Sequence, residues 1–347
     1  MTQNQPDSIL RQRKDDHLRI CLDENVSSET GSGLRSYRLE YDALPEVDLE
    51  AIDLSVTVLG KKLSAPILIG SMTGGSEWAG ELNHRIARVA ARLGLGMGLG
   101  SQRAMLKHRE TASTFAVRET TPDVPLLLGN IGAVQLNYGV TQSDLEWLVE
   151  RVQADGLFFH LNPLQEAIQP EGDTRFSNLL PQMQEIMKAL PFPCVVKEVG
   201  AGISPRTARK LAQLPLAGVE ASGVGGTSWA RVEGYRAAEG TVHATLGERL
   251  RAFGTPTDAS IRACRAAFPE QLVIGSGGVR TGMDVAVALA LGADAVALAR
   301  PVLEAAQESE EALEHFLTTL IHELRVLCFC TGSASIADLK QVRLFRM

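Results

Sequence analysis

Residues 272–300 read LVIGSGGVRTGMDVAVALALGADAVALAR, and this stretch decides the fold. A short apolar run is followed by a glycine pair, then by a series of small and apolar residues, and then by a second apolar run. Apolar runs of this length, bounded by glycine and separated by a helical segment, indicate parallel strands buried on both faces. The stretch therefore predicts one strand, turn, helix and strand unit of a parallel α/β fold.

The glycine turn in this stretch has the composition of an anion-binding site. Gly277 and Gly278 lack side chains, so their backbone N–H groups can approach a phosphate closely, and the following helix adds the positive end of its dipole. Arg280 and Arg300 each follow a predicted strand, where ligands bind in such folds. A bare turn is the alternative, but the two arginines favour phosphate binding.

Length and composition suit one large domain. The chain has 347 residues, of which 45% are hydrophobic, enough for an α/β barrel with additions. Its net charge of −7 argues against nucleic acid or an anionic membrane as the main partner. No stretch has the ~18 apolar residues of a membrane span, and the N-terminal residues lack the apolar core of a signal peptide, so we expect neither membrane insertion nor secretion. The five cysteines lie mostly in apolar runs, as in a reducing compartment, so we expect a cytoplasmic protein.

Eight apolar runs recur along the chain. They begin at residues 66, 94, 125, 156, 194, 218, 272 and 293, and helical patterns fill the gaps between them. Eight β/α units close a TIM barrel, so we predict a (β/α)8 barrel over residues 63–347. A doubly wound sheet is the competing architecture, but the sequence contains neither G-x-G-x-x-G nor a P-loop.

Other segments depart from this pattern. Residues 1–62 are expected to form an N-terminal arm and plug, in which residues 1–9 are polar and predicted to be disordered. A basic cluster over residues 11–19 is either a solvated helix or an arm over an anionic substrate. The alternation of polar and apolar residues over 53–63 predicts a hairpin or a plug at the bottom of the barrel. Residues 222–256 are too long for an ordinary loop and predict a lid or an oligomer contact. A helix pair is expected to run from residue 300 to the end.

Polar residues follow each apolar run, at the strand ends where the active site of a TIM barrel lies. A lone serine or asparagine is more often a cap, so it is their convergence that indicates a site. A phosphate cradle, a wall of hydroxyl and amide groups and one lysine suit a phosphorylated planar cofactor such as FMN. Lys197 can stabilise a reduced, anionic isoalloxazine, and Thr73 and Asn130 can bond its edge.

Several strings in this order carry a family resemblance: RKDDH, MTGG, GSQR, HLNPLQE, VKEVG, GVGGTSW, GGVRTG and LAR, between residues 13 and 300. The combination resembles the type 2 isopentenyl-diphosphate isomerases, FMN-dependent TIM-barrel enzymes that interconvert isopentenyl diphosphate and dimethylallyl diphosphate. HLNPLQE together with the N-terminal RK pair is specific, whereas GGVRTG is shared with many flavin barrels.

The resemblance implies roles for individual residues. FMN would contact Ser71, Met72, Thr73, Gly74, Ser101, Asn130, Lys197, Ser222, Thr227, Gly277, Gly278, Val279, Arg280, Ala299 and Arg300. The substrate would meet Arg13, Lys14, His17, Ser101, Gln102, Arg103, His160, Asn162 and Gln165. Gln165, which would face the alkene, and His160 would be the catalytic residues, and Glu166 would hold Mg²⁺.

The implied reaction adds one proton to a weakly basic alkene and removes another. Gln165 is a neutral amide and Glu166 suits a hard cation, so the cofactor must carry the difficult step. We hypothesise proton exchange at the N5 or C4a region of reduced FMN without net redox change, with NADPH needed only to reduce the flavin. Binding of the unreacting diphosphate can fix the geometry, which explains the many basic residues.

Other interpretations stay open. An FMN-dependent dehydrogenase or oxidase of hydroxy acids or nucleotides would have the same barrel but calls for a late His and Arg pair or a loop cysteine. A non-catalytic flavin-binding or scaffold protein would use the insertion and the arm for partner contacts. Trp229 suits either a cover for the flavin or an interface. Barrels with long inserts often associate, so we expect a homo-oligomer, a tetramer or an octamer.

Overall fold

The computed structural model describes residues 5–347, with side chains from residue 13 onward. Eight parallel strands form one closed barrel. They are β4 (Ile67–Ile69), β5 (Gly96–Gly98), β6 (Leu126–Gly132), β7 (Gly156–Leu161), β8 (Cys194–Glu198), β9 (Gly218–Glu220), β10 (Leu272–Ser276) and β11 (Ala295–Leu298). Each begins within two residues of its predicted start, and the TIM barrel is confirmed.

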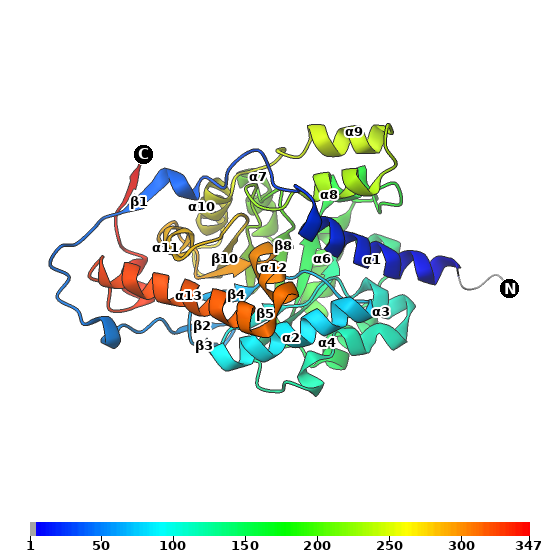
Figure 1. The fold of residues 1–347 in the computed structure, drawn as a ribbon. Coiled ribbons are helices and arrows are strands. Elements are labelled where there is room, and N and C mark those ends of the chain that lie inside the picture. The colour runs from blue at the N-terminus through cyan, green and yellow to red at the C-terminus, as the bar shows by residue number, and fades with distance from the viewer. Residues whose placement is uncertain (1–4) are drawn as a thin grey trace.

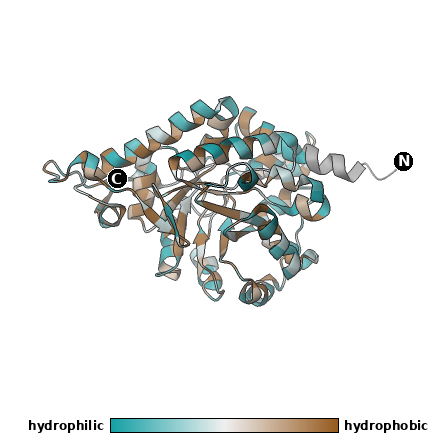
Figure 2. Cartoon of the chain, turned by 90° about the horizontal axis from the view of Figure 1, so that it is seen from below, coloured by the Kyte–Doolittle hydropathy of each residue, from teal (hydrophilic) through white to brown (hydrophobic). Residues whose placement is uncertain are grey.

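Helices surround the barrel, and their termini follow from local sequence (Figure 1). Thr141 and Thr281 form capping boxes with the aspartates three residues later, which satisfies the first N–H groups of two of these helices. The helices are α2 (Glu77–Leu93), α3 (Arg103–Lys107), α4 (Gln142–Val152), α5 (Pro163–Ile168), α6 (Leu179–Ala189), α7 (Pro205–Leu211), α10 (Thr257–Ala267), α11 (Gly282–Ala290), α12 (Arg300–Glu308) and α13 (Glu310–Phe329). Figure 2 shows mainly hydrophobic strands at the centre and mixed helices around them.

The amino end of the barrel is closed by a hairpin. Strands β2 (Val56–Val58) and β3 (Lys61–Leu63) pair antiparallel, as predicted over residues 53–63. Val58 and Leu63 are buried against the apolar residues that fill the barrel interior, including Leu126 and Phe158. The Lys61 ammonium pairs with Asp155, 3.0 Å away, at the start of β7. Apolar packing and one ion pair therefore hold the hairpin in place.

The N-terminal helix α1 (Gln5–Asp23) contacts α2, α8 and α12 near the carboxyl ends of the strands (Figure 1). Disorder was the wrong prediction for residues 5–9, which are helical, and the prediction for residues 1–4 lies outside the described residues. Leu18 and Cys21 are buried in the core, so packing of the later turns anchors the helix. None of the helices in residues 5–347 combines the length and the apolar character that crossing a bilayer requires.

The insertion after β9 contains two helices, α8 (Trp229–Arg236) and α9 (Val242–Arg249). They cross closely at two glycines: a Cβ added to Gly247 would lie 2.4 Å from the Gly234 Cα. Only residues without side chains permit this approach. The crossing supports α8, which lies beside α5 and α1 at the mouth of the barrel.

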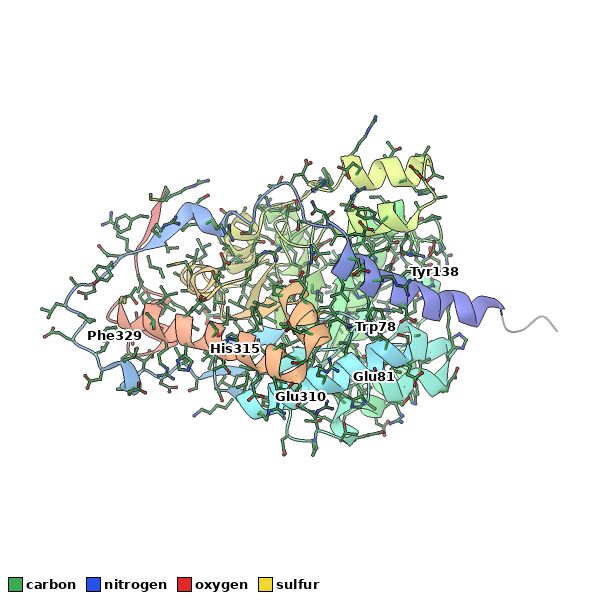
Figure 3. The ribbon with its side chains drawn as sticks, in the orientation of Figure 1. Trp78, Glu81, Tyr138, Glu310, His315 and Phe329 are labelled. Carbon is green, nitrogen blue, oxygen red and sulfur yellow. The ribbon has the colours of Figure 1, made fainter. Side chains whose placement is uncertain are left out.

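The C-terminal segment differs from the prediction of a helix pair that runs to the end. Helix α13 ends before Gly332, which adopts a φ of 63°, and a short helix α14 (Ile336–Leu339) and a strand β12 (Leu344–Arg346) follow. β12 pairs antiparallel with β1 (Tyr37–Leu39), because the alternating polar and apolar residues of VRLFR suit an edge strand. Glu310 of α13 pairs with Arg88 and Arg92 of α2, which joins the first and last barrel helices (Figure 3).

Candidate active site

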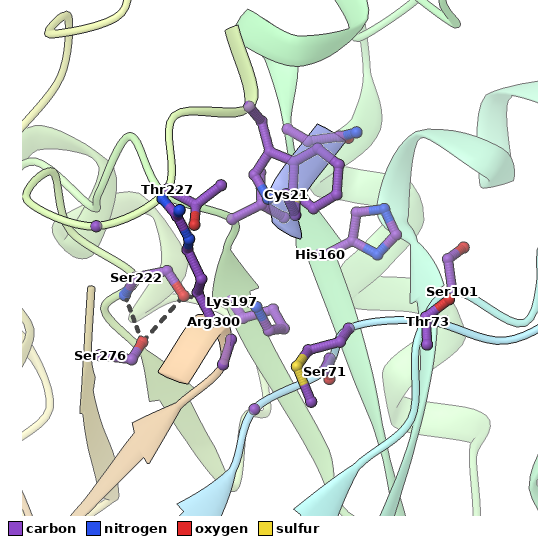
Figure 4. A pocket seen from close by; sticks show the side chains of 18 of the residues that line it. Cys21, Ser71, Thr73, Ser101, His160, Lys197, Ser222, Thr227, Ser276 and Arg300 are labelled. Atoms are coloured by element: carbon purple, nitrogen blue, oxygen red, sulfur yellow. Dashed lines mark hydrogen bonds between the residues drawn. The ribbon is translucent and has the colours of Figure 1, made fainter. Parts of the chain in front are cut away.

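A cavity of about 220 Å³ lies at the carboxyl ends of the strands, and residues from the ends of all eight strands line it (Figure 4). The arm contributes Arg13, Lys14 and His17, so α1 covers the cavity of its own chain. The other predicted site residues in the lining are Ser71, Met72, Thr73, Ser101, Arg103, Asn130, His160, Asn162, Gln165, Glu166, Lys197, Ser222, Thr227, Gly277, Gly278, Val279, Arg280, Ala299 and Arg300.

Two predicted site residues lie outside the lining. Gln102 is fully buried behind the wall, where its amide donates to the Leu148 carbonyl and accepts from the Asn130 N–H. Gly74 has a φ of 151°, and a Cβ there would lie 2.0 Å from the Phe115 ring. Gln102 therefore supports β6, and Gly74 permits close packing of its loop, so the predictions of direct ligand contact are not matched by this geometry.

The glycine turn forms a cradle that side chains would fill. Gly277 and Gly278 have φ values of 106° and 72°, which favour glycine, and a Cβ on Gly226 would lie 2.7 Å from the Gly278 nitrogen. Arg300 approaches the same side of the cavity and donates to the Ser27 hydroxyl. Backbone N–H groups beside an arginine suit a phosphate.

Two hydroxyl groups of the wall have no partner among the described residues. The Ser71 and Thr73 oxygens are buried and make no hydrogen bond there. Buried polar groups in native proteins are nearly always paired, so a ligand is expected to satisfy them. With the cradle on one side and the buried Lys197 ammonium on another, these residues fit FMN: a phosphate in the cradle and a polar ring edge along the wall.

A second group of cations lies across the barrel from the cradle. Arg13 and Lys14 of α1 meet Arg103 at the end of β5. Burial, and then the charges of Arg13 and Arg103, lower the pKa of Lys14 to about 7. The Arg13 and Arg103 Nε atoms have no hydrogen-bond partner among the described residues, although Arg103 also forms an ion pair with Asp173. Such a cluster is complementary to a polyanion.

His160 is held in one tautomer. Its Nδ1 lies 2.9 Å from Asn130 Oδ1, and the Asn130 amide nitrogen donates to the Leu99 carbonyl. Asn130 Oδ1 is thus the acceptor, and His160 Nδ1 carries the hydrogen. Burial, and then the charge of Lys197, lower the pKa of His160 to about 3. The ring is therefore neutral near pH 7, with a lone pair at Nε2.

Glu233 is an important residue that sequence reasoning missed. It is fully buried on α8, and its Oε1 accepts from Gln165 Nε2 at 2.8 Å and from His17 Nε2 at 3.0 Å. Burial acts to raise the pKa of Glu233, but the His17 hydrogen bond and the Arg236 charge outweigh it and lower the pKa to about 2. Trp229, one helical turn earlier, has its ring 5.1 Å from His17. Trp229 and Glu233 are four residues apart and share one face of α8, and this spacing was the sequence signal that could have identified Glu233.

Glu166 is buried with one side toward the cavity. Its Oε1 accepts from Asn162 at 2.9 Å, and its Oε2 accepts from the Asp173 N–H at 2.6 Å. Burial raises the pKa of its carboxyl. No group of three or more acidic, histidine or cysteine residues in the described part of the chain could hold a metal ion. A lone carboxylate suits only a cation that takes its other oxygens from ligand or water.

The chain resembles known flavin enzymes in sequence and in fold. Residues 19–157 and 130–346 match the family described as FMN-dependent dehydrogenase. The isopentenyl-diphosphate delta-isomerase of Synechococcus sp. is 49% identical over 341 residues, with 98% of this chain and 97% of the relative covered. The enzyme of that name from Nostoc sp. is 48% identical over 329 residues, with 94% and 93% covered.

Solved structures show the same fold at lower identity. A mandelate oxidase variant with a monooxide FMN adduct has a TM-score of 0.66 and 16% identity, with 98% of this chain and 100% of that chain covered. Lactate oxidase from Pediococcus acidilactici has a TM-score of 0.67 and 16% identity, with 98% and 93% covered. The sequence relatives confirm the resemblance: the chain belongs to the isopentenyl-diphosphate delta-isomerase family and to the FMN-dependent dehydrogenases.

Proposed function

We propose that the protein is an FMN-dependent isopentenyl-diphosphate delta-isomerase of isoprenoid biosynthesis, which interconverts isopentenyl diphosphate and dimethylallyl diphosphate. One observation carries the proposal: a single cavity combines two anion sites, the glycine cradle near Arg300 and the cation cluster of Arg13, Lys14 and Arg103. A phosphorylated cofactor uses one site, and a diphosphate substrate uses the other. The polar wall between them fits a flavin ring.

When bound and reduced, FMN supplies a ring that exchanges a proton with the alkene without net redox change. The cradle and Arg300 would hold its phosphate, and Thr73, Asn130 and Lys197 would bind the ring edge. Since reduction only activates the flavin, NADPH acts as a priming reductant.

The cation cluster binds the diphosphate and thereby positions the alkene. A bound diphosphate favours the charged form of Lys14, whose pKa burial lowers to about 7 in the free protein. Because the diphosphate does not react, its binding energy serves orientation of the reacting end. Glu166 would hold Mg²⁺ beside the diphosphate, and a single carboxylate there would leave the remaining oxygen ligands to substrate and water.

Gln165 orients the reacting end of the substrate. Its nitrogen donates to Glu233, and its oxygen accepts from Asn162 at 3.0 Å, so both ends of the amide are fixed. A neutral amide cannot protonate an alkene, but a fixed one can position the alkene against the proton donor. Trp229 and Leu18 in the lining exclude water from that end.

Two further proposals concern the state of the protein. We propose a homo-oligomer, a tetramer or an octamer, supported by the exposed Val242 and Phe253 of the insertion. We also propose a cytoplasmic location, supported by five free cysteines. Size-exclusion chromatography with light scattering tests the first, and microscopy of a tagged chain tests the second.

The test of function is direct. Protein loaded with FMN, reduced with dithionite and supplied with Mg²⁺ should convert isopentenyl diphosphate to dimethylallyl diphosphate over many turnovers. In a parallel assay with NADPH in place of dithionite, NADPH should be consumed only in the activation phase, and consumption that matches product formation would contradict an isomerase. Bleaching of the oxidised flavin by a hydroxy acid would instead favour an oxidase. Sequence relatives at 42–49% identity outweigh the fold likeness to such oxidases, which rests on 16–17%.

A further inference from the structure

We propose that Glu220 is a positioning residue that acts through Lys197: its buried carboxylate is a counter-charge that limits how strongly the site stabilises negative charge on reduced FMN. The inference deepens the proposed function and rests on it only in requiring bound FMN. Glu220 is 3% exposed and Lys197 is 5% exposed, and both line the cavity.

Neighbouring strands place the two charges side by side. Lys197 of β8 and Glu220 of β9 are partners in the parallel register, and the Lys197 Nζ lies 3.6 Å from Glu220 Oε1. The closest partner of that ammonium is the Glu198 carbonyl at 2.8 Å. Lys197 thus has one side toward the cavity and a carboxylate beside it. Glu220 therefore reduces the positive potential that Lys197 presents to a ligand.

Two hydroxyl groups fix the carboxylate. Glu220 Oε1 accepts from the Ser276 hydroxyl at 2.8 Å and from the Ser222 hydroxyl at 3.0 Å (Figure 4 shows both serines beside Lys197). An oxygen that accepts from two hydroxyls and faces an ammonium has the environment of an ionised carboxylate.

The backbone beside Glu220 is strained to complete this arrangement. Ser222 adopts a φ of 39°, a left-handed conformation that is strained for a non-glycine residue. In this conformation its N–H donates to the Ser276 hydroxyl and its own hydroxyl reaches Glu220. Strain held in place by a buried hydrogen-bond network marks a geometry that the site requires.

The counter-charge matters because of what reduction does to a flavin. Two electrons and one proton convert the oxidised ring to its anionic reduced form, so the ring gains one negative charge. Lys197 favours that charge, and Glu220 opposes it. A cofactor that must both give and take a proton works best when neither protonation state is strongly preferred. Glu220 therefore keeps the reduced ring easier to protonate than Lys197 alone would.

Three variants separate charge from hydrogen bonding. Glu220→Gln removes the charge and should shift the reduction equilibrium of bound FMN about tenfold towards the reduced form, a rise of ~30 mV in the midpoint potential. Glu220→Asp withdraws the charge from Lys197 and should give a smaller rise. Ser276→Ala, the matched control, removes the hydroxyl that bonds Glu220 and Ser222 and keeps the charge of Glu220, so its shift should stay under about twofold.

The measurement is anaerobic reductive titration of the FMN-loaded protein against a reference dye, with dithionite as reductant. A second readout is the pH at which the spectrum of the reduced flavin changes, which should be lower in Glu220→Gln. An unchanged or lower potential in Glu220→Gln would overturn the inference, as would an equal rise in Ser276→Ala. If the glutamine variant does not fold, Glu220→Asp decides by the same criterion. The wild-type isomerase assay separately tests the proposed function, so the two failures are distinguishable.

Discussion

Two aspartates at the amino end of the barrel and two hydroxyl groups at its carboxyl end differ in whether the protein itself supplies their hydrogen-bond partners. At the amino end, Asp155 and Asp294 precede β7 and β11, and each accepts from the N–H of the second residue of a neighbouring strand, Leu127 of β6 and Val273 of β10, at 2.8 and 2.9 Å. Each also pairs with an arginine and a lysine. At the carboxyl end, the Ser71 and Thr73 hydroxyls have no partner among the described residues. Asp155 and Asp294 therefore contribute to stability, whereas the Ser71 and Thr73 hydroxyls, which line the cavity, are expected to bind a ligand.

Removal of Asp155 is expected to have the largest effect, and on stability alone. Asp155→Ala leaves Arg118, 13% exposed, without its carboxylate and the Leu127 N–H without its acceptor, so the free energy of unfolding should fall by about 3 kcal/mol. Chemical denaturation measures this loss, with the exposed Asp123→Ala as control. The folded fraction should bind FMN with unchanged affinity. A loss of FMN affinity with full stability would break the division between the two ends.

Substitution of Gln165 should have the converse effect. Gln165→Asn shortens the side chain that Glu233 and Asn162 hold, and a displacement of about 1 Å at a positioned group costs about 100-fold in turnover. Stability and FMN content should stay near wild type. Steady-state kinetics and the flavin spectrum measure both, with the distant surface substitution Gln142→Asn as control. Unchanged turnover would show that the amide is only structural.

Much of the fold could be predicted because its signals are local. Glycine or proline beside a short apolar run indicates a strand, and capping boxes at Thr141 and Thr281 mark helix starts. The site residues at the carboxyl ends of the strands could also be predicted, because ligand sites in such barrels lie at that end. Gln102 was misplaced because it lies in the turn that leads into α3, where its side chain is buried behind the wall while its neighbours Ser101 and Arg103 line the cavity.

The charges that tune the site could not be predicted in the same way. Glu220 lies within an apolar strand, and its role appears only when the register sets it beside Lys197. Glu233 lies in the insertion, and its contact with Gln165 depends on how α8 packs against α5. Both pairings join residues far apart in sequence, and no local pattern encodes them.

Anion binding at the carboxyl end of the barrel should depend on pH. The pKa of Lys14 is lowered to about 7 by burial, so between pH 7 and 9 the free protein must take up a proton when a polyanion binds. Affinity for inorganic pyrophosphate should therefore fall with rising pH by up to tenfold per unit more than in Lys14→Arg, whose side chain stays charged. Calorimetric titrations of both proteins give the difference, and identical profiles would contradict a neutral Lys14.

The same burial predicts how stability depends on pH. The pKa of Lys14 in the folded chain lies below its unfolded value, so the unfolded state binds more protons between pH 7 and about 10.5. Lys14 alone therefore makes the free protein more stable as the pH rises through that window. Bound pyrophosphate should remove this slope, because it favours the charged form. The slope is measured as the change in unfolding free energy between pH 7 and 9, with and without pyrophosphate. Lys14→Met, which has no titrating group at this position, is the control.

The smallest effect is expected at an unpartnered hydroxyl of the wall. Thr73→Val keeps the shape of a buried side chain and removes an oxygen that bonds nothing among the described residues. Stability of the FMN-free protein should thus stay the same or rise slightly, whereas FMN affinity should fall by about 1 kcal/mol, roughly fivefold. Flavin fluorescence titration and denaturation of the FMN-free protein measure the two. The opposite signs are the informative result: a polar group that costs stability until its ligand arrives belongs to the binding end of the barrel, and a loss of stability without FMN would place Thr73 with Asp155 instead.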